Sequence, residues 1–180
     1  MVPVTLTGVY TLGPENFVCA LLHAEDPARY IPVWLPPVEG AHLVARAAGW
    51  SPNRPTAQDL LAEVVGEGLQ SIELSSYYNG VFMATLTLGD GTELDARASD
   101  ALAVALILDR DIEADETVVA QAGMRLTADA AKTYFDLDVV EEETGASASG
   151  DEEKDAAFEQ FMRDLGVDED ELDGGDEGEV

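Results

Sequence analysis

Alternating polar and apolar positions predict three strands near the start of the chain. Residues Val4 to Leu12 alternate with a period of two, which is typical of a strand that buries one face. Two more apolar runs, Asn16 to His23 and Arg29 to Leu35, predict a second and a third strand. Pro32 cannot donate a ladder hydrogen bond, so we expect the third strand at an edge of a sheet or at a bulge.

Two helices and a run of hairpins follow. Pro36-Pro37 begins a helix that continues to about Ala48. Thr56 and Asp59 form the pattern of a capping box, which predicts a second helix that ends near Val65. Tight turns then separate further predicted strands, and Asn79-Gly80 is a strong hairpin signal among them. These strands are Leu69–Tyr78, Val81–Leu88 and Thr92–Asp95.

The stretch from Asp95 to Leu106 lies at the centre of the predicted fold. Every residue from Ala101 to Leu108 is apolar, so this helix has no solvent face and we expect it to be buried. We expect Ser99 to be its N-cap, with Asp100 near the positive end of the helix dipole. A short strand near Ile112 and two more helical segments complete the pattern. The predicted fold class is α+β, with largely antiparallel β-sheets, a buried central helix and an acidic C-terminal tail.

Composition divides the chain into one domain and an appendage. Residues 1–135 form the predicted α+β domain, residues 136–151 a flexible acidic linker, and residues 167–180 a disordered acidic tail. Residues 152–166 predict an amphipathic helix, because apolar side chains recur there at helical spacing. These side chains are Phe158, Phe161, Met162 and Leu165. A helix of this length is marginal alone, so we expect it to fold against another part of the protein.

The net charge of the chain indicates the salt concentration to which this protein is adapted. The 180 residues include 37 acidic and 9 basic ones, which gives a net charge of −28. Residues 1–135 alone hold 18 acidic and 7 basic residues, and only two bases in the whole chain are lysines. Such a surface repels phosphate backbones, and concentrated salt relieves its self-repulsion by screening. We therefore expect a halophilic protein.

The single cysteine and the lack of long apolar runs indicate a cytoplasmic protein. Cys19 has no partner for an internal disulfide and is expected to be a core residue in a reducing compartment. The N-terminus lacks the basic start and the apolar core of a signal peptide. No apolar run approaches the roughly 20 residues needed to span a bilayer, so we expect no membrane association.

The motifs of several common catalytic sites are absent from the sequence. It contains no glycine-rich phosphate loop, Cys/His metal cluster, H-E-x-x-H or G-x-S-x-G motif. Carboxylates and arginines at the ends of predicted elements remain as candidates: Glu39, Arg54, Asp59, Asp95, Arg97 and Asp100. Phosphodiester hydrolysis by carboxylate-held Mg²⁺ or Mn²⁺ is the chemistry that such a set fits. The alternative for the Asp95–Asp100 stretch is a helix cap with an internal ion pair.

Three segments, in this order, carry a family resemblance. The strand Ile31 to Leu35 runs into a helix start at Pro36 to Gly40. Arg54 to Leu60 has the sequence R-P-T-A-Q-D-L, and Asp95 to Ala101 has the sequence D-A-R-A-S-D-A. Together they resemble the bifunctional nuclease domain family over about residues 2–122. This resemblance also supports an α+β fold.

The resemblance implies a metal-assisted nuclease that hydrolyses phosphodiester bonds of DNA and RNA. It would use Mg²⁺ or Mn²⁺, take nucleic acid as its substrate and form a homo-oligomer. The implied metal or base carboxylates are Glu39, Asp59, Asp95 and Asp100, and the implied phosphate contacts are Arg54, Arg97 and Ser99.

The sequence departs from the family pattern at three positions. Gln58 stands where the family has His, Gly40 where it has Ala, and Ala98 where it has Pro. Glutamine cannot act as a general base. The alternative function is therefore a non-catalytic regulatory or assembly module, in which the same polar residues form an internal network.

Both functions require partners for the carboxylates at the helix starts, because such groups are tolerated near a core only when they are paired or hydrogen-bonded. We expect Arg54 or Arg97 within salt-bridge distance of Asp59, Asp95 or Asp100. Three or more carboxylate oxygens around one open point would favour the metal nuclease. Carboxylates that are each capped by an arginine or a backbone N–H would favour the structural network.

Overall fold

The computed structural model describes residues 1–25, 28–138 and 149–166. The chain divides into two structural units. The first unit comprises Met1–Tyr10 and Phe17–Gly123, and the second comprises Thr11–Asn16 together with the chain from Met124 onward.

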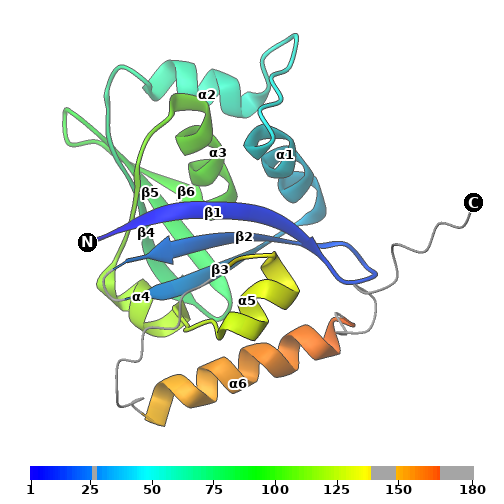
Figure 1. Cartoon of the computed structure of the whole chain (residues 1–180). Coiled ribbons are helices and arrows are strands. Elements are labelled where there is room, and N and C mark those ends of the chain that lie inside the picture. The colour runs from blue at the N-terminus through cyan, green and yellow to red at the C-terminus, as the bar shows by residue number, and fades with distance from the viewer. Residues whose placement is uncertain (26–27, 139–148, 167–180) are drawn as a thin grey trace, which may run out of the picture. The chain divides into compact units, whose positions relative to one another are not determined.

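Seven strands form one mixed sheet in the order β3-β2-β1-β7-β4-β5-β6 (Figure 1). The strands are β1 (Val2–Leu12), β2 (Phe17–Ala24), β3 (Arg29–Leu35), β4 (Leu69–Tyr78), β5 (Val81–Leu88), β6 (Glu93–Arg97) and β7 (Ile112–Ala114). Four of the pairings with a described register are antiparallel, and β4 with β7 is parallel. The predicted α+β class is confirmed. Pro32 lies on β3, which is an edge strand as expected.

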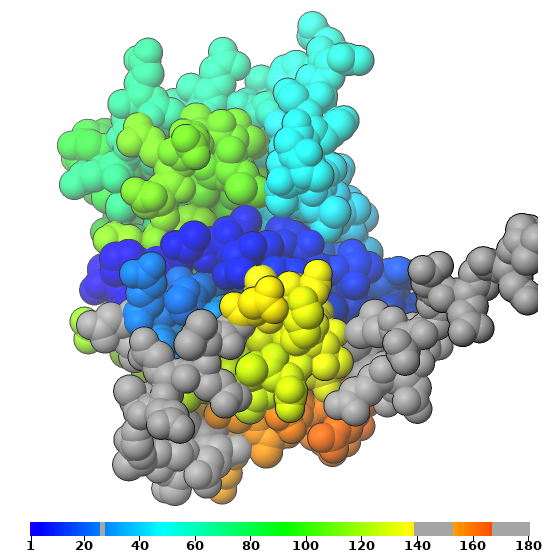
Figure 2. All heavy atoms as spheres, viewed as in Figure 1, coloured from blue at the N-terminus to red at the C-terminus, as the bar shows by residue number. Residues whose placement is uncertain are grey.

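Three helices of the first unit pack together on the sheet. They are α1 (Pro37–Ala47), α2 (Ala57–Val65) and α3 (Ala98–Leu108), and a fourth, α4 (Glu116–Ala122), contacts β3 and β4. Helix α3 contacts both α1 and α2 and also packs on β4, β5 and β6. Figure 1 shows α1 and α3 side by side, and in Figure 2 the atoms of the α1 region (cyan) meet those of α3 (green).

The buried central helix is confirmed, but its start differs from the prediction. All residues from Ala98 to Ala105 except Asp100 are buried, and the last turn is half-buried. The N-cap is Arg97 rather than Ser99, because β6 runs directly into α3 and leaves no loop for a capping residue. Ser99 lies inside the first turn and makes no capping hydrogen bond there.

A glycine lets α1 approach β2 unusually closely. A Cβ atom on Gly40 would lie 2.7 Å from the Cβ atom of Val18, a distance at which one of the two must move. The close approach of α1 to β2 therefore depends on the absence of a side chain at Gly40. Cys19, next to Val18, is fully buried, and burial raises the pKa of its thiol to about 12. Its predicted place in the core is confirmed.

The described part of the second unit includes the helices α5 (Ala128–Phe135) and α6 (Ser149–Asp164). Thr127 caps α5 by accepting a hydrogen bond from the backbone N–H of Ala130. The ring of Phe158 on α6 stacks on that of Phe135 on α5, with 6.3 Å between centroids. The amphipathic helix thus folds against another helix, as expected.

One side chain of the predicted apolar stripe on α6 does not turn inward. Met162 is fully buried, whereas Phe161 is 42% exposed. The reason is geometric, because adjacent residues on a helix point about 100° apart and the contact with α5 is made by Phe158. Most of the predicted linker and all of the predicted tail lie outside the described residues. No described helix is long and apolar enough to cross a membrane.

Candidate functional site

The three segments that carry the resemblance meet at one pocket in the first unit. Glu39 lies in the first turn of α1, Gln58 in the first turn of α2, and Asp100 in the first turn of α3. Ten residues line the pocket: Glu39, His42, Leu43, Arg46, Trp50, Thr56, Gln58, Ser99, Asp100 and Ala103. Helix N-termini carry partial positive charge, so the acidic side chains of Glu39 and Asp100 are tolerated at these positions.

Arg97 joins two of the carboxylates across the helices. Its Nη1 atom donates to Oε1 of Glu39 at 2.7 Å, although 58 residues separate the two in the chain. Its Nε atom donates to Oδ2 of Asp100 at 2.8 Å, and Nη2 donates to Oδ1 at 3.3 Å. The expected pairing of an arginine with Asp100 is confirmed. The contact with Glu39 ties the start of α1 to the end of β6.

These contacts set the electrostatics of the pair. A backbone hydrogen bond at Glu39, and then the hydrogen bond from Arg97, lower the pKa of the Glu39 carboxyl. Hydrogen bonds to Asp100 and then to Glu39 raise the pKa of Arg97. Gln58 adds a donor to the cluster, because its Nε2 atom lies 3.3 Å from Oδ1 of Asp100. Glu39 and Arg97 therefore both keep their charges across the neutral range.

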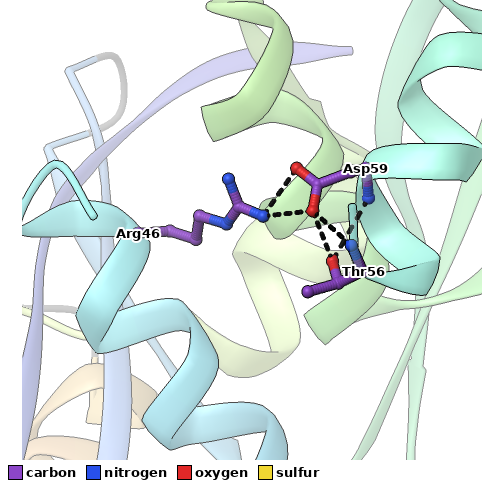
Figure 3. A network of polar contacts seen from close by, with 3 residues as sticks. All are labelled: Arg46, Thr56 and Asp59. Atoms are coloured by element: carbon purple, nitrogen blue, oxygen red, sulfur yellow. Dashed lines mark hydrogen bonds and ion pairs between the residues drawn. The ribbon is translucent and has the colours of Figure 1, made fainter. Parts of the chain in front are cut away.

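A second network surrounds Asp59 (Figure 3). Nη2 of Arg46 donates to both carboxylate oxygens of Asp59, at 2.6 and 2.5 Å. The backbone N–H and the hydroxyl of Thr56 each donate to Oδ2 at 2.7 Å. The backbone N–H of Asp59 donates back to Oγ1 of Thr56 at 3.4 Å, which completes the predicted capping box. Burial alone would raise the pKa of Asp59, but the bonds from Thr56 and Arg46 outweigh it and lower the pKa to about 2.

Asp59 pairs with Arg46 and not with Arg54, the arginine nearest to it in sequence. Arg54 is near Asp59 in sequence, yet its side chain is exposed and makes no ion pair within the described part of the chain. Arg46, in the last turn of α1, takes that place because α1 and α2 both pack against α3 and bring their facing ends together. Asp95, on β6, is also exposed and does not line the pocket. Ser99 does line it and is buried.

One face of α1 supplies pocket residues that the sequence analysis did not select. His42, Leu43 and Arg46 follow Glu39 by three, four and seven residues, so the four side chains share one side of the helix. This spacing is visible in the sequence, and it could have identified these residues as one face of the helix. Trp50 follows in the loop after α1, and its ring lies 5.3 Å from the guanidinium carbon of Arg46. No local signal pointed to Trp50.

The donor set does not fit a preformed metal centre. Across residues 1–25, 28–138 and 149–166, no group of three or more His, Cys, Asp or Glu side chains is placed to hold a metal ion. Glu39 and Asp100 come closest to a pair of ligands, but both already bind the guanidinium of Arg97. We derive no catalytic step through a metal ion.

Comparisons with known proteins identify the same family that the three segments indicate. A family model described as a bifunctional nuclease domain matches residues 20–127. Two proteins from two strains of Mycobacterium tuberculosis are each 31% identical to this chain over 124 residues. The aligned region covers 67% of this chain and 76% of each relative. Both relatives are named as uncharacterized proteins.

Proposed function

Because this chain belongs to the bifunctional nuclease domain family, we propose that it hydrolyses phosphodiester bonds of nucleic acids at the pocket between α1, α2 and α3. The observation that carries the proposal is the convergence of Glu39, Gln58 and Asp100 on that pocket from three distant segments. Packing alone does not require polar side chains from all three helix starts to face the same depression.

Two groups can serve tasks of this reaction: His42, which lines the pocket, and Arg97, which does not line it but binds Glu39 and Asp100, which do. Arg97 presents a planar guanidinium whose side chain is 62% exposed, and arginine matches phosphate oxygens with paired hydrogen bonds. His42 is exposed and lines the pocket, and histidine is the side chain that most often acts as a general base. In this proposal Arg97 positions the phosphate and His42 accepts a proton from water.

Mg²⁺ and Mn²⁺ are the cations to add to a nuclease assay, because the site contains the carboxylates of Glu39 and Asp100. Mg²⁺ at phosphoryl-transfer sites is commonly bound by one or two carboxylates together with oxygens of the substrate phosphate. Glu39 and Asp100 provide two carboxylates, so substrate oxygens would have to complete the ligand set. Dependence on the cation is therefore a variable of the assay.

Hydrolysis of supercoiled DNA and of RNA tests the proposal. The assay is run with Mg²⁺ or Mn²⁺, or with EDTA, at low and at multimolar KCl. We expect cleavage by the wild type, and a loss of about a hundredfold or more in His42→Ala and Asp100→Asn. Glu63→Gln is the matched control, because Glu63 is an exposed carboxylate on α2 outside the pocket. Purified wild type that cleaves neither substrate in any of these conditions would contradict the proposal.

A second function is favoured by one specific observation. The carboxylates at the three helix starts all bind arginines, Glu39 and Asp100 through Arg97 and Asp59 through Arg46. This pairing supports a non-catalytic regulatory or assembly module. We propose separately that such a module forms homo-oligomers. In that case Asp100→Asn would lower the melting temperature, the wild type would show no turnover, and light scattering would give a mass larger than one chain.

The composition of the chain bears on the medium in which the protein works. We propose that the protein works in a salt-rich cytoplasm. The net charge of −28 and the scarcity of lysine support this. In such a medium, contacts to nucleic acid that depend on phosphate charge are weak.

A further inference from the structure

Trp50 is a large aromatic side chain held in place yet open to solvent. Its backbone N–H donates to the carbonyl of Ala45 at 2.9 Å, just after Gly49 turns the chain with a positive φ of 82°. Its ring lies 5.3 Å from the guanidinium carbon of Arg46. The side chain nevertheless remains 47% exposed while lining the pocket. A tryptophan fixed in this way offers aromatic surface at little cost in conformational entropy.

Arg46 is itself fixed, so the support beneath Trp50 is rigid. The Arg46 side chain is only 11% exposed and is bound to both carboxylate oxygens of Asp59. A cation over an aromatic ring is attracted to its π-electrons. Trp50 is therefore backed by a charged group that cannot easily move away.

The charge of the protein limits how nucleic acid can bind at this pocket. Single-strand binding proteins ordinarily combine a basic groove with stacked aromatic side chains. Here Arg97 and Arg46 are both engaged by carboxylates, and the chain carries a net charge of −28. Little binding energy can come from phosphate contacts, least of all in concentrated salt. Stacking does not depend on neutralising phosphates, so it is the contribution that remains.

We infer that Trp50 is the stacking platform for an unpaired nucleobase, so that the pocket takes single-stranded rather than duplex nucleic acid. This inference rests on the proposed function and names its substrate class. Bases inside a duplex have both faces covered, whereas an unpaired base can stack on an aromatic side chain. The Gln58 amide and the His42 ring line the same pocket as Trp50. In this inference they are the polar groups offered to the edge of such a base.

Binding is tested without hydrolysis, in EDTA, with the full chain at 0.5 M and 3 M KCl. The probes are a labelled 12-nucleotide single strand, a duplex of the same sequence, and a mononucleotide. Fluorescence anisotropy reports the affinity for the two oligonucleotides. Quenching in a Trp34→Phe background, where Trp50 is the only tryptophan, reports stacking directly and also covers the mononucleotide.

The variants separate stacking from a general loss of structure. We expect Trp50→Ala to bind the single strand about tenfold more weakly or worse, and Trp50→Phe to retain most of the affinity. Tyr78→Ala is the matched control, because Tyr78 is 70% exposed, at the end of β4 and outside the pocket. The single strand should bind more tightly than the duplex, and its affinity should change little between the two salt concentrations.

Three results would overturn the inference: equal affinity for duplex and single strand, an affinity of Trp50→Ala within twofold of the wild type, or no binding of the single strand. Quenching by the mononucleotide equal to that by the strand would also count against it, because the site would then be one for free nucleotides. The outcome is separable from the proposed function. If the protein binds the single strand through Trp50 but never cleaves it, the inference about Trp50 stands and the proposed nuclease function is wrong. If the protein cleaves nucleic acid and Trp50→Ala cleaves it equally well, the nuclease function stands and the inference is wrong.

Discussion

At the scale of single residues, each acidic group at the starts of α1, α2 and α3 has a donor that makes its charge tolerable. Asp59 receives the most bonds, from Thr56 and from Arg46, while Asp100 shares Arg97 with Glu39. The bonds to Asp59 lower the pKa of its carboxyl to about 2. A chain with 37 acidic residues can therefore place carboxylates near its core without a metal ion to balance them.

Asp59 should make a measurable and pH-dependent contribution to stability. Asp59→Asn should lower the free energy of unfolding at pH 7 by about 1.5–3 kcal/mol, the range for hydrogen bonds to charged groups. Because the pKa of Asp59 is lower in the folded state, this contribution is complete above the usual value near 4. It is lost as pH falls toward about 2. Urea denaturation in 2 M KCl at several pH values would measure both effects.

The control for that experiment is Glu63→Gln, which removes an exposed carboxylate from the same helix. It should leave the stability at pH 7 within about 0.5 kcal/mol of the wild type. If Asp59→Asn and the wild type lost stability in parallel between pH 4 and pH 2, the network around Asp59 would not stabilise the fold in the way described.

At the scale of elements, α3 is the helix on which the first unit is assembled. It packs on α1, on α2 and on three strands, and its first two turns are almost wholly buried. Its last turn is only half-buried, which the uniform apolar sequence did not reveal. Tolerance to substitution should therefore change along the helix.

A charge placed at two positions along α3, one in the middle and one in the last turn, should measure this gradient. Leu102 is fully buried, so Leu102→Asp should destabilise by several kcal/mol, enough to prevent folding in dilute buffer. Leu106 is half-buried, so Leu106→Asp should cost clearly less, because the carboxylate can reach water. Thermal melts followed by circular dichroism would rank the two variants. Equal costs would contradict the burial gradient.

The contact between α1 and β2 gives a second prediction at this scale. Gly40→Ala should lower the free energy of unfolding by about 1–2 kcal/mol, despite the better helix propensity of alanine, because the new Cβ meets Val18. Combining it with Val18→Ala removes the clash, so the double variant should lose less than the sum of the single changes. Chemical denaturation of the four proteins measures this coupling. Simple additivity would show that α1 shifts away at no cost.

At the scale of the whole molecule, the net charge of −28 is the feature from which we predict how stability depends on salt. Residues 1–135 carry a net charge of −11, and the rest of the chain adds −17. Mutual repulsion among these charges opposes the compact state and is relieved by screening, since the Debye length falls to about 3 Å at 1 M salt.

The melting temperature should therefore rise strongly between 0.1 M and 2 M KCl. The reason is that screening reduces the repulsion of the folded chain more than that of the expanded one. A chain that ends at Phe135 is not a suitable control, because α5 contacts α6 through Phe135. The same melts in 2 M sucrose, which leaves charge repulsion in place, separate screening from general stabilisation. A midpoint that stayed equal or fell in 2 M KCl would argue against adaptation to salt.

The sequence by itself determined the local elements of this protein. The predicted bounds of β3, β4 and β5 match the structure, as do the capping box at Thr56 and the hairpin turn at Asn79-Gly80. The burial of α3 also followed from its composition. These features depend on alternation, turn geometry and caps, all of which act between residues close in the chain.

Only the tertiary structure decided which polar residues meet. Arg46 rather than Arg54 binds Asp59, and Arg97 binds Glu39 across 58 residues, because the packing of α1 and α2 on α3 sets those distances. The same packing turned one face of α1 and the ring of Trp50 toward the pocket. Ser99 lost its capping position when β6 ran straight into α3. Ion pairs form wherever folded side chains come within reach, so proximity in sequence could not have identified them.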